Sequence, residues 1–137
     1  MLIAILSQLN VLSVVVAALA GWIFGSLWYW ALGQQWRSSL QPPLPAGYRP
    51  GAAAIVISLV AELIMAAMLF GVVFHIGEVN VERALFSAVM LWIGFVATTV
   101  TVNNRFARDS WSRTLIDAGH WLGVLLVMGL VIGLFGA

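Results

Sequence analysis

Ionisable side chains inside apolar segments are the first candidates for chemistry in this sequence. Glu62 lies near the middle of the apolar stretch Ala52–Phe74, which contains no other charged residue. A carboxyl group at this depth in a bilayer is costly unless it is paired, hydrated or hydrogen-bonded. Two hypotheses follow. Either Glu62 is hydrogen-bonded to a neighbouring helix in a structural role, or it takes part in proton- or cation-coupled transport.

Asp117 and His120 form a second candidate site. They are three residues apart, which places both on one face of a helix. We expect Asp117 to be ionised and paired with an arginine from the preceding loop, either Arg105 or Arg113. The structural hypothesis is a hydrogen-bond network that locks two helices together. The functional hypothesis is a site, open to the cytoplasm, for a lipid headgroup, a proton or a small ligand.

A stripe of small and hydroxyl-bearing residues in the preceding apolar segment is expected to pack against this Asp-His face. Its members recur at spacings of four, three and four, as on one face of a helix: Gly94, Thr98, Thr101 and Arg105. With Tyr29, the two threonines supply the hydroxyl groups that catalysis by Asp117 and His120 would need. An Asp-His-Thr set in this order and spacing matches no specific catalytic arrangement, so we expect no enzyme activity.

The sequence predicts no metal site and leaves the identity of any cofactor open. His75, Glu78 and Glu82 could be metal ligands, but we expect Gly77 to break the helix between them and the exposed acids to be solvated. His75 and His120 each lack the flanking residues of a haem or pigment site, which favours hydrogen-bonded histidines. The absence of cysteine excludes disulfides, thiolate metal sites and iron–sulfur clusters.

Composition defines the elements that must position these residues. Of the 137 residues, 63% are hydrophobic and 8% are charged, whereas a soluble domain has about 25% charged residues. This composition excludes a water-soluble enzyme, and the lack of a basic run excludes nucleic acid as a partner. Four segments have the length and apolar character of membrane-spanning helices: Asn10–Leu32, Ala52–Phe74, Ala84–Asn104 and Thr114–Phe135. We therefore expect one all-α transmembrane domain over residues 1–137, a four-helix bundle in which Met1–Leu9 extends the first helix or lies in the membrane interface.

The distribution of arginines predicts the orientation of this bundle. Five of the six arginines lie in the first and third connections, residues 33–51 and 105–113, and one lies in the middle turn. Because cytoplasmic loops carry an excess of basic residues, both termini are expected on the non-cytoplasmic side. Aromatic residues gather toward the arginine-rich side: Trp28, Tyr29, Trp30, Trp36, Tyr48, Trp111 and Trp121. We interpret them as an aromatic belt in which most rings anchor the protein in lipid.

Small residues at four-residue intervals predict close helix packing. They occur in the first and fourth segments: Ala17, Gly21 and Gly25, then Gly119 and Gly123, then Gly129 and Gly133. Such stripes let membrane helices approach one another closely. Gly119 and Gly123 lie away from Asp117 around the fourth helix, so we expect this helix to contact one neighbour through glycine and another through its Asp-His face. Packing within one chain and packing in a homo-oligomer are both compatible with the stripes.

Several motifs resemble one known family. They are Gly25-x-x-Trp28-Tyr29 followed by Gly33-x-x-Trp36, the segment Leu91–Thr99, and Leu115-Ile116-Asp117-Ala118-Gly119-His120-Trp121. Together they resemble a bacterial family of small four-helix membrane proteins known as domain of unknown function 1761. The resemblance covers nearly the whole chain, and it implies a four-helix membrane fold without implying a known chemistry.

The sequence therefore predicts a multi-pass protein of the bacterial cytoplasmic membrane that is not an enzyme. We expect it to contact membrane lipids and to bind or stabilise a partner in the bilayer, either a copy of itself or a subunit of a larger membrane complex. The alternative is a small proton- or ion-coupled transporter or channel that uses Glu62. Transport predicts that Glu62 faces a hydrated cavity, whereas a structural role predicts that it is buried against protein.

Overall fold

The computed structural model describes Ile3 and residues 7–137, and this part of the chain is helical apart from its connections. The third span, Val81–Phe106, is continuous and includes a π-helical segment, η1. The elements are α2 (Val11–Ser39), α3 (Ala52–Ile76), α4 (Val81–Leu91), η1 (Trp92–Ala97), α5 (Thr98–Phe106) and α6 (Trp111–Phe135). All four spans are long and apolar enough to cross a membrane, which confirms the predicted all-α fold.

The first helix is longer than hydropathy predicts. It continues past Leu32 to Ser39, because the polar residues Gln34, Gln35 and Arg37 are good helix formers although they are not apolar. The helix ends just before the proline-rich part of the connection, where proline cannot continue a helix. The first connection is therefore residues 40–51. The expectation for Met1–Leu9 concerns a segment of which residues 1–2 and 4–6 lie outside the described residues.

Side-chain caps fix the starts of the third and fourth spans. Asn80 Oδ1 accepts a hydrogen bond from the Arg83 amide at 3.0 Å, and Ser110 Oγ accepts one from the Arg113 amide at 3.1 Å. Each cap satisfies a backbone donor that the helix itself cannot pair. Both spans consequently begin a few residues before the positions expected from hydropathy.

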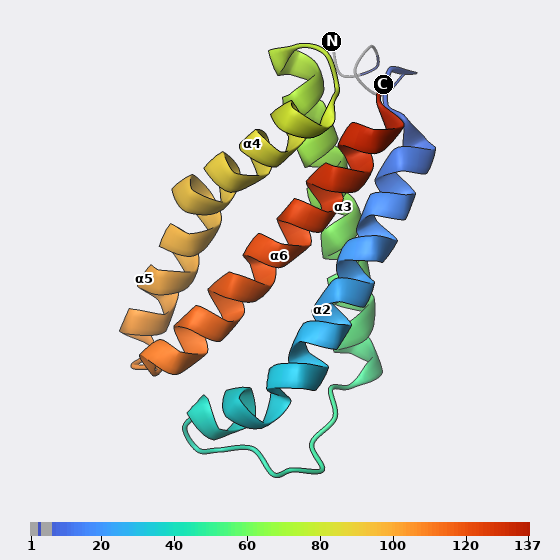
Figure 1. Cartoon of the computed structure of the whole chain (residues 1–137). Coiled ribbons are helices and arrows are strands. Elements are labelled where there is room, and N and C mark those ends of the chain that lie inside the picture. Colours follow the sequence, from blue (N-terminus) through green and yellow to red (C-terminus); the bar gives the residue numbers. More distant parts are fainter. Residues whose placement is uncertain (1–2, 4–6) are drawn as a thin grey trace.

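The arrangement of the helices places the connections at two ends of the bundle. In Figure 1, α6 lies between α2 and α4 and packs extensively against both, while α3 packs against α2. The start of α2, the turn between α3 and α4, and the C-terminus lie at one end (Figure 1). The connection from α2 to α3 and the turn from α5 to α6 lie at the other end. The two arginine-rich connections thus share one side, as the predicted topology requires.

The hydrophobic core occupies the end of the bundle that carries the termini. Its largest fully buried apolar side chains are Leu69, Phe70, Val73, Val124, Met128 and Ile132. In α3, the buried residues begin at Glu62, and the preceding ten residues of this helix contribute none. The N-terminal part of α3 therefore stands apart from the core.

The glycine stripes of α6 are used for packing within the chain. Gly119 and Gly123 lie against aromatic side chains of α2, and Gly129 and Gly133 lie against the backbone at the start of α4. A side chain at any of these four positions would meet atoms of the neighbouring helix. Both stripes thus bring α6 close to its neighbours in the same chain.

Two tryptophans form hydrogen bonds between helices: Trp28, which belongs to the predicted aromatic belt, and Trp92, which does not. The indole nitrogen of Trp28 donates to the Ile116 carbonyl at 3.1 Å, and that of Trp92 donates to the Ala118 carbonyl at 2.8 Å. Trp30 is 83% exposed, as a lipid-facing ring should be. Trp28 thus has a role in the contact between α2 and α6 besides any contact with lipid, and the prediction of lipid anchoring concerned most of the rings.

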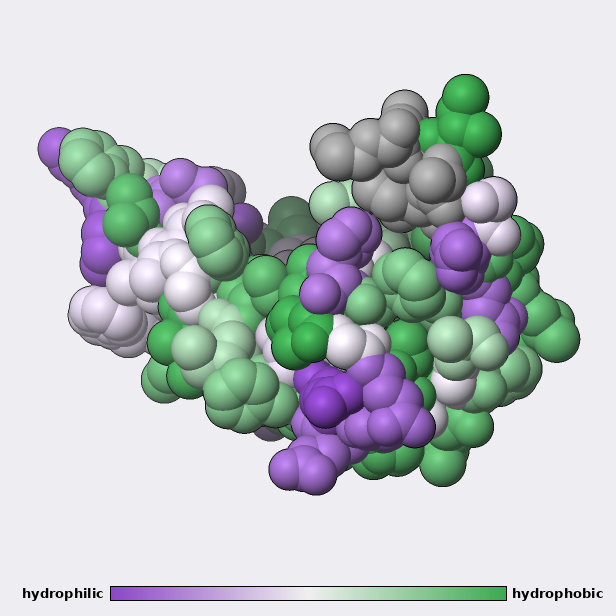
Figure 2. Space-filling model, turned by 90° about the horizontal axis from the view of Figure 1, so that it is seen from above, coloured by the Kyte–Doolittle hydropathy of each residue, from purple (hydrophilic) through white to green (hydrophobic). Residues whose placement is uncertain are grey.

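The outer surface of the helices is largely apolar. On α3, the exposed large side chains include Val56, Ile57, Val60, Ile64 and Met68. Seen from the end that carries the termini, hydrophilic residues gather in separate patches with hydrophobic residues between them (Figure 2). Such an apolar lateral surface suits contact with lipid chains.

Candidate functional site

A groove of about 720 Å³ lies between α2 and α3, with α6 contributing to its wall. The α2 residues that line it occur singly or in adjacent pairs about one helical turn apart, as on one helical face: Trp22, Gly25, Ser26, Tyr29, Trp30, Gly33, Trp36 and Arg37. The opposite wall is the N-terminal part of α3, which lacks buried residues before Glu62. The groove therefore forms where α3 separates from the core, and Glu62 lies at the point of separation.

Glu62 is the most deeply buried ionisable group in the groove. Its side chain is 2% exposed, and Oε2 has no hydrogen-bond partner within the residues that the structure describes. The carboxyl group lies against α2, where a Cβ atom at Gly21 would be 2.9 Å from Oε2. One turn away, Trp22 Nε1 donates to Ser58 Oγ at 3.1 Å and ties α2 to α3. The expected structural hydrogen bond from Glu62 to a neighbouring helix is not formed in the described part of the chain.

His120 projects from α6 into the same groove. Its ring lies between those of Tyr29 and Trp121, with centroid separations of 4.7 and 4.5 Å. A Cβ atom at Gly25 would be 2.5 Å from His120 Nε2, so only glycine leaves room for the ring here. His120 is 6% exposed, and among residues 7–137 its Nδ1 has no hydrogen-bond partner. It is the second buried polar group of the groove with an unpaired atom.

Asp117 connects the groove to the start of α6. Its Oδ1 accepts a hydrogen bond from the Tyr29 hydroxyl at 2.6 Å, and its Oδ2 lies 3.5 Å from Arg113 Nε in an ion pair. Arg113 Nη1 also lies 2.8 Å from Asp109 Oδ1. Of the two arginines expected to pair with Asp117, the structure places Arg113 beside it. Tyr29, Asp117 and His120 are thus brought together, as neighbours across the α2–α6 contact.

The stripe on the third span does not pack on Asp117 and His120 as expected. Thr98 is exposed, and its hydroxyl donates to the Gly94 carbonyl of its own span at 2.9 Å, while Thr101 is half-buried. The observed neighbour of the Asp-His face is α2, the same helix that packs on Gly119 and Gly123. The positions of residues on one helical face do not specify which helix that face meets, and here α2 packs against both the Asp-His face and the glycines Gly119 and Gly123.

Arg105 organises the turn between α5 and α6 instead of binding Asp117. Its Nη2 donates to Thr114 Oγ1 at 2.6 Å and to the Ser110 carbonyl at 3.1 Å. Its guanidinium carbon lies 3.9 Å from the centroid of the Trp111 ring, a cation–π contact. The expected alternative of an Arg105–Asp117 pair is therefore wrong.

The residues considered as metal ligands at the opposite end are spread over a turn. As predicted, α3 ends at Gly77, which has a φ of 151°. His75 Nδ1 is hydrogen-bonded to the Gly71 carbonyl at 2.7 Å, and Glu78 and Glu82 are exposed. Within residues 7–137, this turn contributes to no cluster of three metal-ligating side chains.

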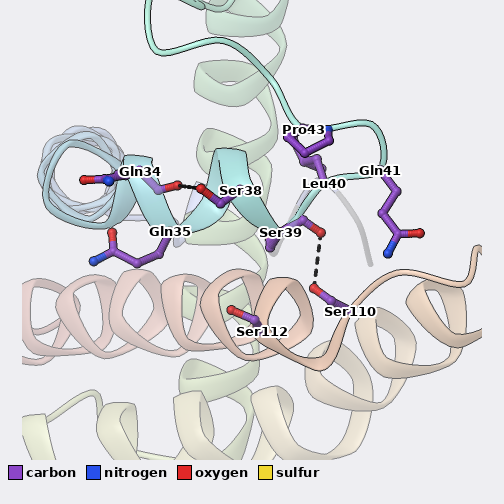
Figure 3. A pocket seen from close by; sticks show the side chains of 9 residues that line it. All are labelled: Gln34, Gln35, Ser38, Ser39, Leu40, Gln41, Pro43, Ser110 and Ser112. Atoms are coloured by element: carbon purple, nitrogen blue, oxygen red, sulfur yellow. Dashed lines mark hydrogen bonds between the residues drawn. The ribbon is translucent and has the colours of Figure 1, made fainter.

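A second hollow, of about 670 Å³, lies beside the connection from α2 to α3 and is lined mainly by glutamine and serine residues (Figure 3). Two of its serine hydroxyls already have partners: Ser38 donates to the Gln34 carbonyl, and Ser110 donates to the Ser39 carbonyl at 3.2 Å (Figure 3). Gln41 lies on the connection, across the hollow from the start of α6 (Figure 3). The hydrogen bond from Ser110 to Ser39 links the end of α2 to the start of α6. None of the described residues that line this hollow has a buried side-chain N or O atom without a partner, in contrast to the groove.

A family model described as "Protein of unknown function (DUF1761)" matches residues 12–133. The chain belongs to this family. The matched region of this DUF1761 protein includes every groove residue contributed by α2, α3 and α6. No curated protein and no solved structure matches the chain. The resemblance inferred from the sequence motifs is confirmed, and the function must be argued from the site.

Sequence reasoning missed several groove residues of this DUF1761 chain. Trp36 was predicted only as an interfacial residue, and Trp22 and Ser58 only as members of apolar membrane-spanning segments. The signal was the recurrence of aromatic and small residues on one face of α2, from Trp22 to Trp36. Such a face of aromatic and glycine residues on α2 borders a groove only where the facing helix, α3, is separated from it. The sequence does not specify that separation.

Proposed function

We propose that this protein is a non-enzymatic membrane protein that binds a ligand in the groove between α2 and α3. The observation that carries the proposal is that two buried ionisable residues, Glu62 and His120, line the same groove and each has a buried atom without a partner in the described part of the chain, Oε2 and Nδ1 respectively. Buried polar atoms without partners are costly and uncommon in folded proteins. A ligand that bonds to them removes this cost, and the groove volume falls within the range of about 300–1,000 Å³ of small-molecule sites.

Filling the groove tests this proposal. Ala54 lines the groove and is exposed, so Ala54→Trp should occupy ligand space without disturbing the core. Ala53 is its exposed neighbour on α3 outside the groove, and Ala53→Trp is the matched control. Native mass spectrometry of gently purified protein should show a retained ligand in the wild type and in Ala53→Trp. We expect Ala54→Trp to lose it, and equal retention by both variants would contradict the proposal.

Proton- or ion-coupled transport is the second candidate function. It is favoured by the position of Glu62 on the wall of a groove, which the transport alternative requires. A binding protein without transport activity should show no ligand flux when it is reconstituted in liposomes. Flux that Glu62→Gln abolishes, while the folded protein is retained, would support transport.

We also propose that the protein lies in the bacterial cytoplasmic membrane with both termini outside. The proposal is supported by five arginines in the first and third connections or in the helix ends beside them, and these connections lie at one end of the bundle. Reporter fusions after Ala137 should be active only when the reporter works outside the cytoplasm. A fusion at Ala137 that is active only with a cytoplasmic reporter would reverse this orientation.

A partner chain in the membrane remains part of the proposal. The exposed apolar face of α3 is available for lipid, for a second copy or for a subunit of a larger complex. The glycine stripes of α6 give little support to an oligomer, because they pack within the chain. The native mass spectra that report a retained ligand also count the subunits.

A further inference from the structure

We propose that the groove selects a lipophilic organic cation, with its positive charge beside Glu62 and its apolar body against the aromatic walls. This inference rests on the proposed function, because it names the ligand class for the same groove. It follows from the charge of Glu62 on the groove wall, from the chemistry of the other walls and from the lack of a partner for Glu62 Oε2 among the described residues.

The charges around the groove favour a cation beside Glu62. Among the described residues that line the groove, Glu62 is the only one with a carboxyl side chain. The other titratable or charged side chains that line it are Tyr29 and Arg37 from α2, Tyr48 from the connection, and His120 from α6. Arg37 lies four helical turns beyond Trp22, about 22 Å along α2 at 1.5 Å per residue. Within the described lining, the one permanent positive charge is therefore far from Glu62.

The buried position of Glu62 makes a positive ligand its natural partner. An ionised carboxylate in a low-dielectric environment is stable only when an opposite charge or several hydrogen bonds compensate for lost hydration. In the described part of the chain, no arginine forms an ion pair with Glu62. A cationic ligand would supply the missing charge, whereas an anionic ligand would meet the carboxyl group without compensation.

The walls supply the second element of recognition. Six aromatic side chains line the groove: Trp22, Tyr29, Trp30, Trp36, Tyr48 and Trp121. Of these, Trp22 is hydrogen-bonded to Ser58, one helical turn from Glu62. The negative face of an aromatic ring attracts an organic cation and also packs against its apolar groups. A carboxyl group together with several aromatic rings is thus the chemistry expected for a lipophilic ammonium or phosphonium ion.

Two probe ions of matched shape and opposite charge test this inference. Tetraphenylphosphonium and tetraphenylborate are titrated separately into the detergent-solubilised protein, with binding followed by calorimetry. We expect tetraphenylphosphonium to bind with one site per chain and at least tenfold more tightly than tetraphenylborate. Glu62→Gln should weaken tetraphenylphosphonium binding at least tenfold, and it should strengthen tetraphenylborate binding, because it removes the charge that disfavours the anion. Glu78→Gln, which alters an exposed acid outside the groove, should change neither affinity.

The outcomes separate the ligand class from the existence of a binding groove. Equal binding of the two ions, tighter binding of tetraphenylborate, or full cation affinity in Glu62→Gln would overturn the cation proposal. If Glu62→Gln fails to fold, Ala54→Trp decides, because it must abolish tetraphenylphosphonium binding while Ala53→Trp retains it. The two proposals can also fail separately. If Ala54→Trp loses a retained native ligand but the wild type binds both probe ions equally, the groove is a binding site and only its selectivity for cations is refuted.

Discussion

Asp117→Ala is expected to lower the free energy of unfolding by about 2–3 kcal/mol, since hydrogen bonds to charged groups contribute about 1.5–3 kcal/mol. The substitution removes the acceptor of the 2.6 Å hydrogen bond from Tyr29 and the ion-pair partner of Arg113. The ion pair adds little, because the side chains of Arg113 and Asp117 are 30% and 20% exposed and partly screened. Most of the loss should come from the Tyr29 hydroxyl. Denaturant unfolding in detergent, followed by circular dichroism, measures the change.

Glu78→Ala is the control for this prediction, because Glu78 is an exposed acid in the turn after α3. It should unfold at nearly the same denaturant concentration as the wild type. Tyr29→Phe should reproduce much of the Asp117→Ala effect, and the double substitution should cost less than the sum of the two. Equal stabilities of Asp117→Ala and Glu78→Ala would show that the network contributes nothing to the α2–α6 contact.

Gly133→Ala is expected to destabilise the bundle by about 1–3 kcal/mol, the usual cost of overpacking a close contact. A Cβ atom at Gly133 would lie 2.6 Å from the Val81 amide nitrogen and would also meet its Cα. These are backbone atoms at the start of α4, so relief requires α4 and α6 to move apart. The thermal unfolding midpoint in detergent should fall accordingly.

Gly71→Ala provides the matched control within another membrane helix. Gly71 lies inside α3, and a Cβ atom there would meet no described atom within 4 Å. Alanine is favoured over glycine inside a helix by about 1 kcal/mol, so Gly71→Ala should be neutral or slightly stabilising. If both alanine variants are stabilised alike, the close approach of α6 to α4 is not required for the fold.

The two contacts probed by these substitutions show how α6 holds the site in place. Toward the termini, its glycines pack against the start of α4 and fix one side of the bundle. Toward the other end, Asp117 and His120 contact Tyr29 of α2 and fix the wall of the groove. The groove thus has two walls, on α2 and α6, that are packed against each other, while its third wall, the N-terminal part of α3, has no buried residue before Glu62.

The sequence alone determined the class of the protein and the number of its membrane helices. The low proportion of charged residues and the four long apolar segments indicate a membrane protein. Within a membrane, each backbone N–H and C=O group must be hydrogen-bonded inside the protein, so these segments are helices. The motif around Asp117 and His120 also indicated the family, and helical periodicity placed these two residues on one face. Arg113 was among the predicted partners of Asp117 because it is four residues away on the same helix.

Tertiary structure decided which helices meet and where they separate. Periodicity assigns residues to a face, but every apolar face can pack against any other, so the sequence could not choose α2 over the third span as the neighbour of Asp117. That choice depends on which glycines meet which side chains, as at Gly25 and His120. The groove depends on a separation, because it exists only where α3 leaves the core before Glu62. Local sequence pattern records the faces of single helices, whereas a gap between two helices is a property of the whole packed bundle.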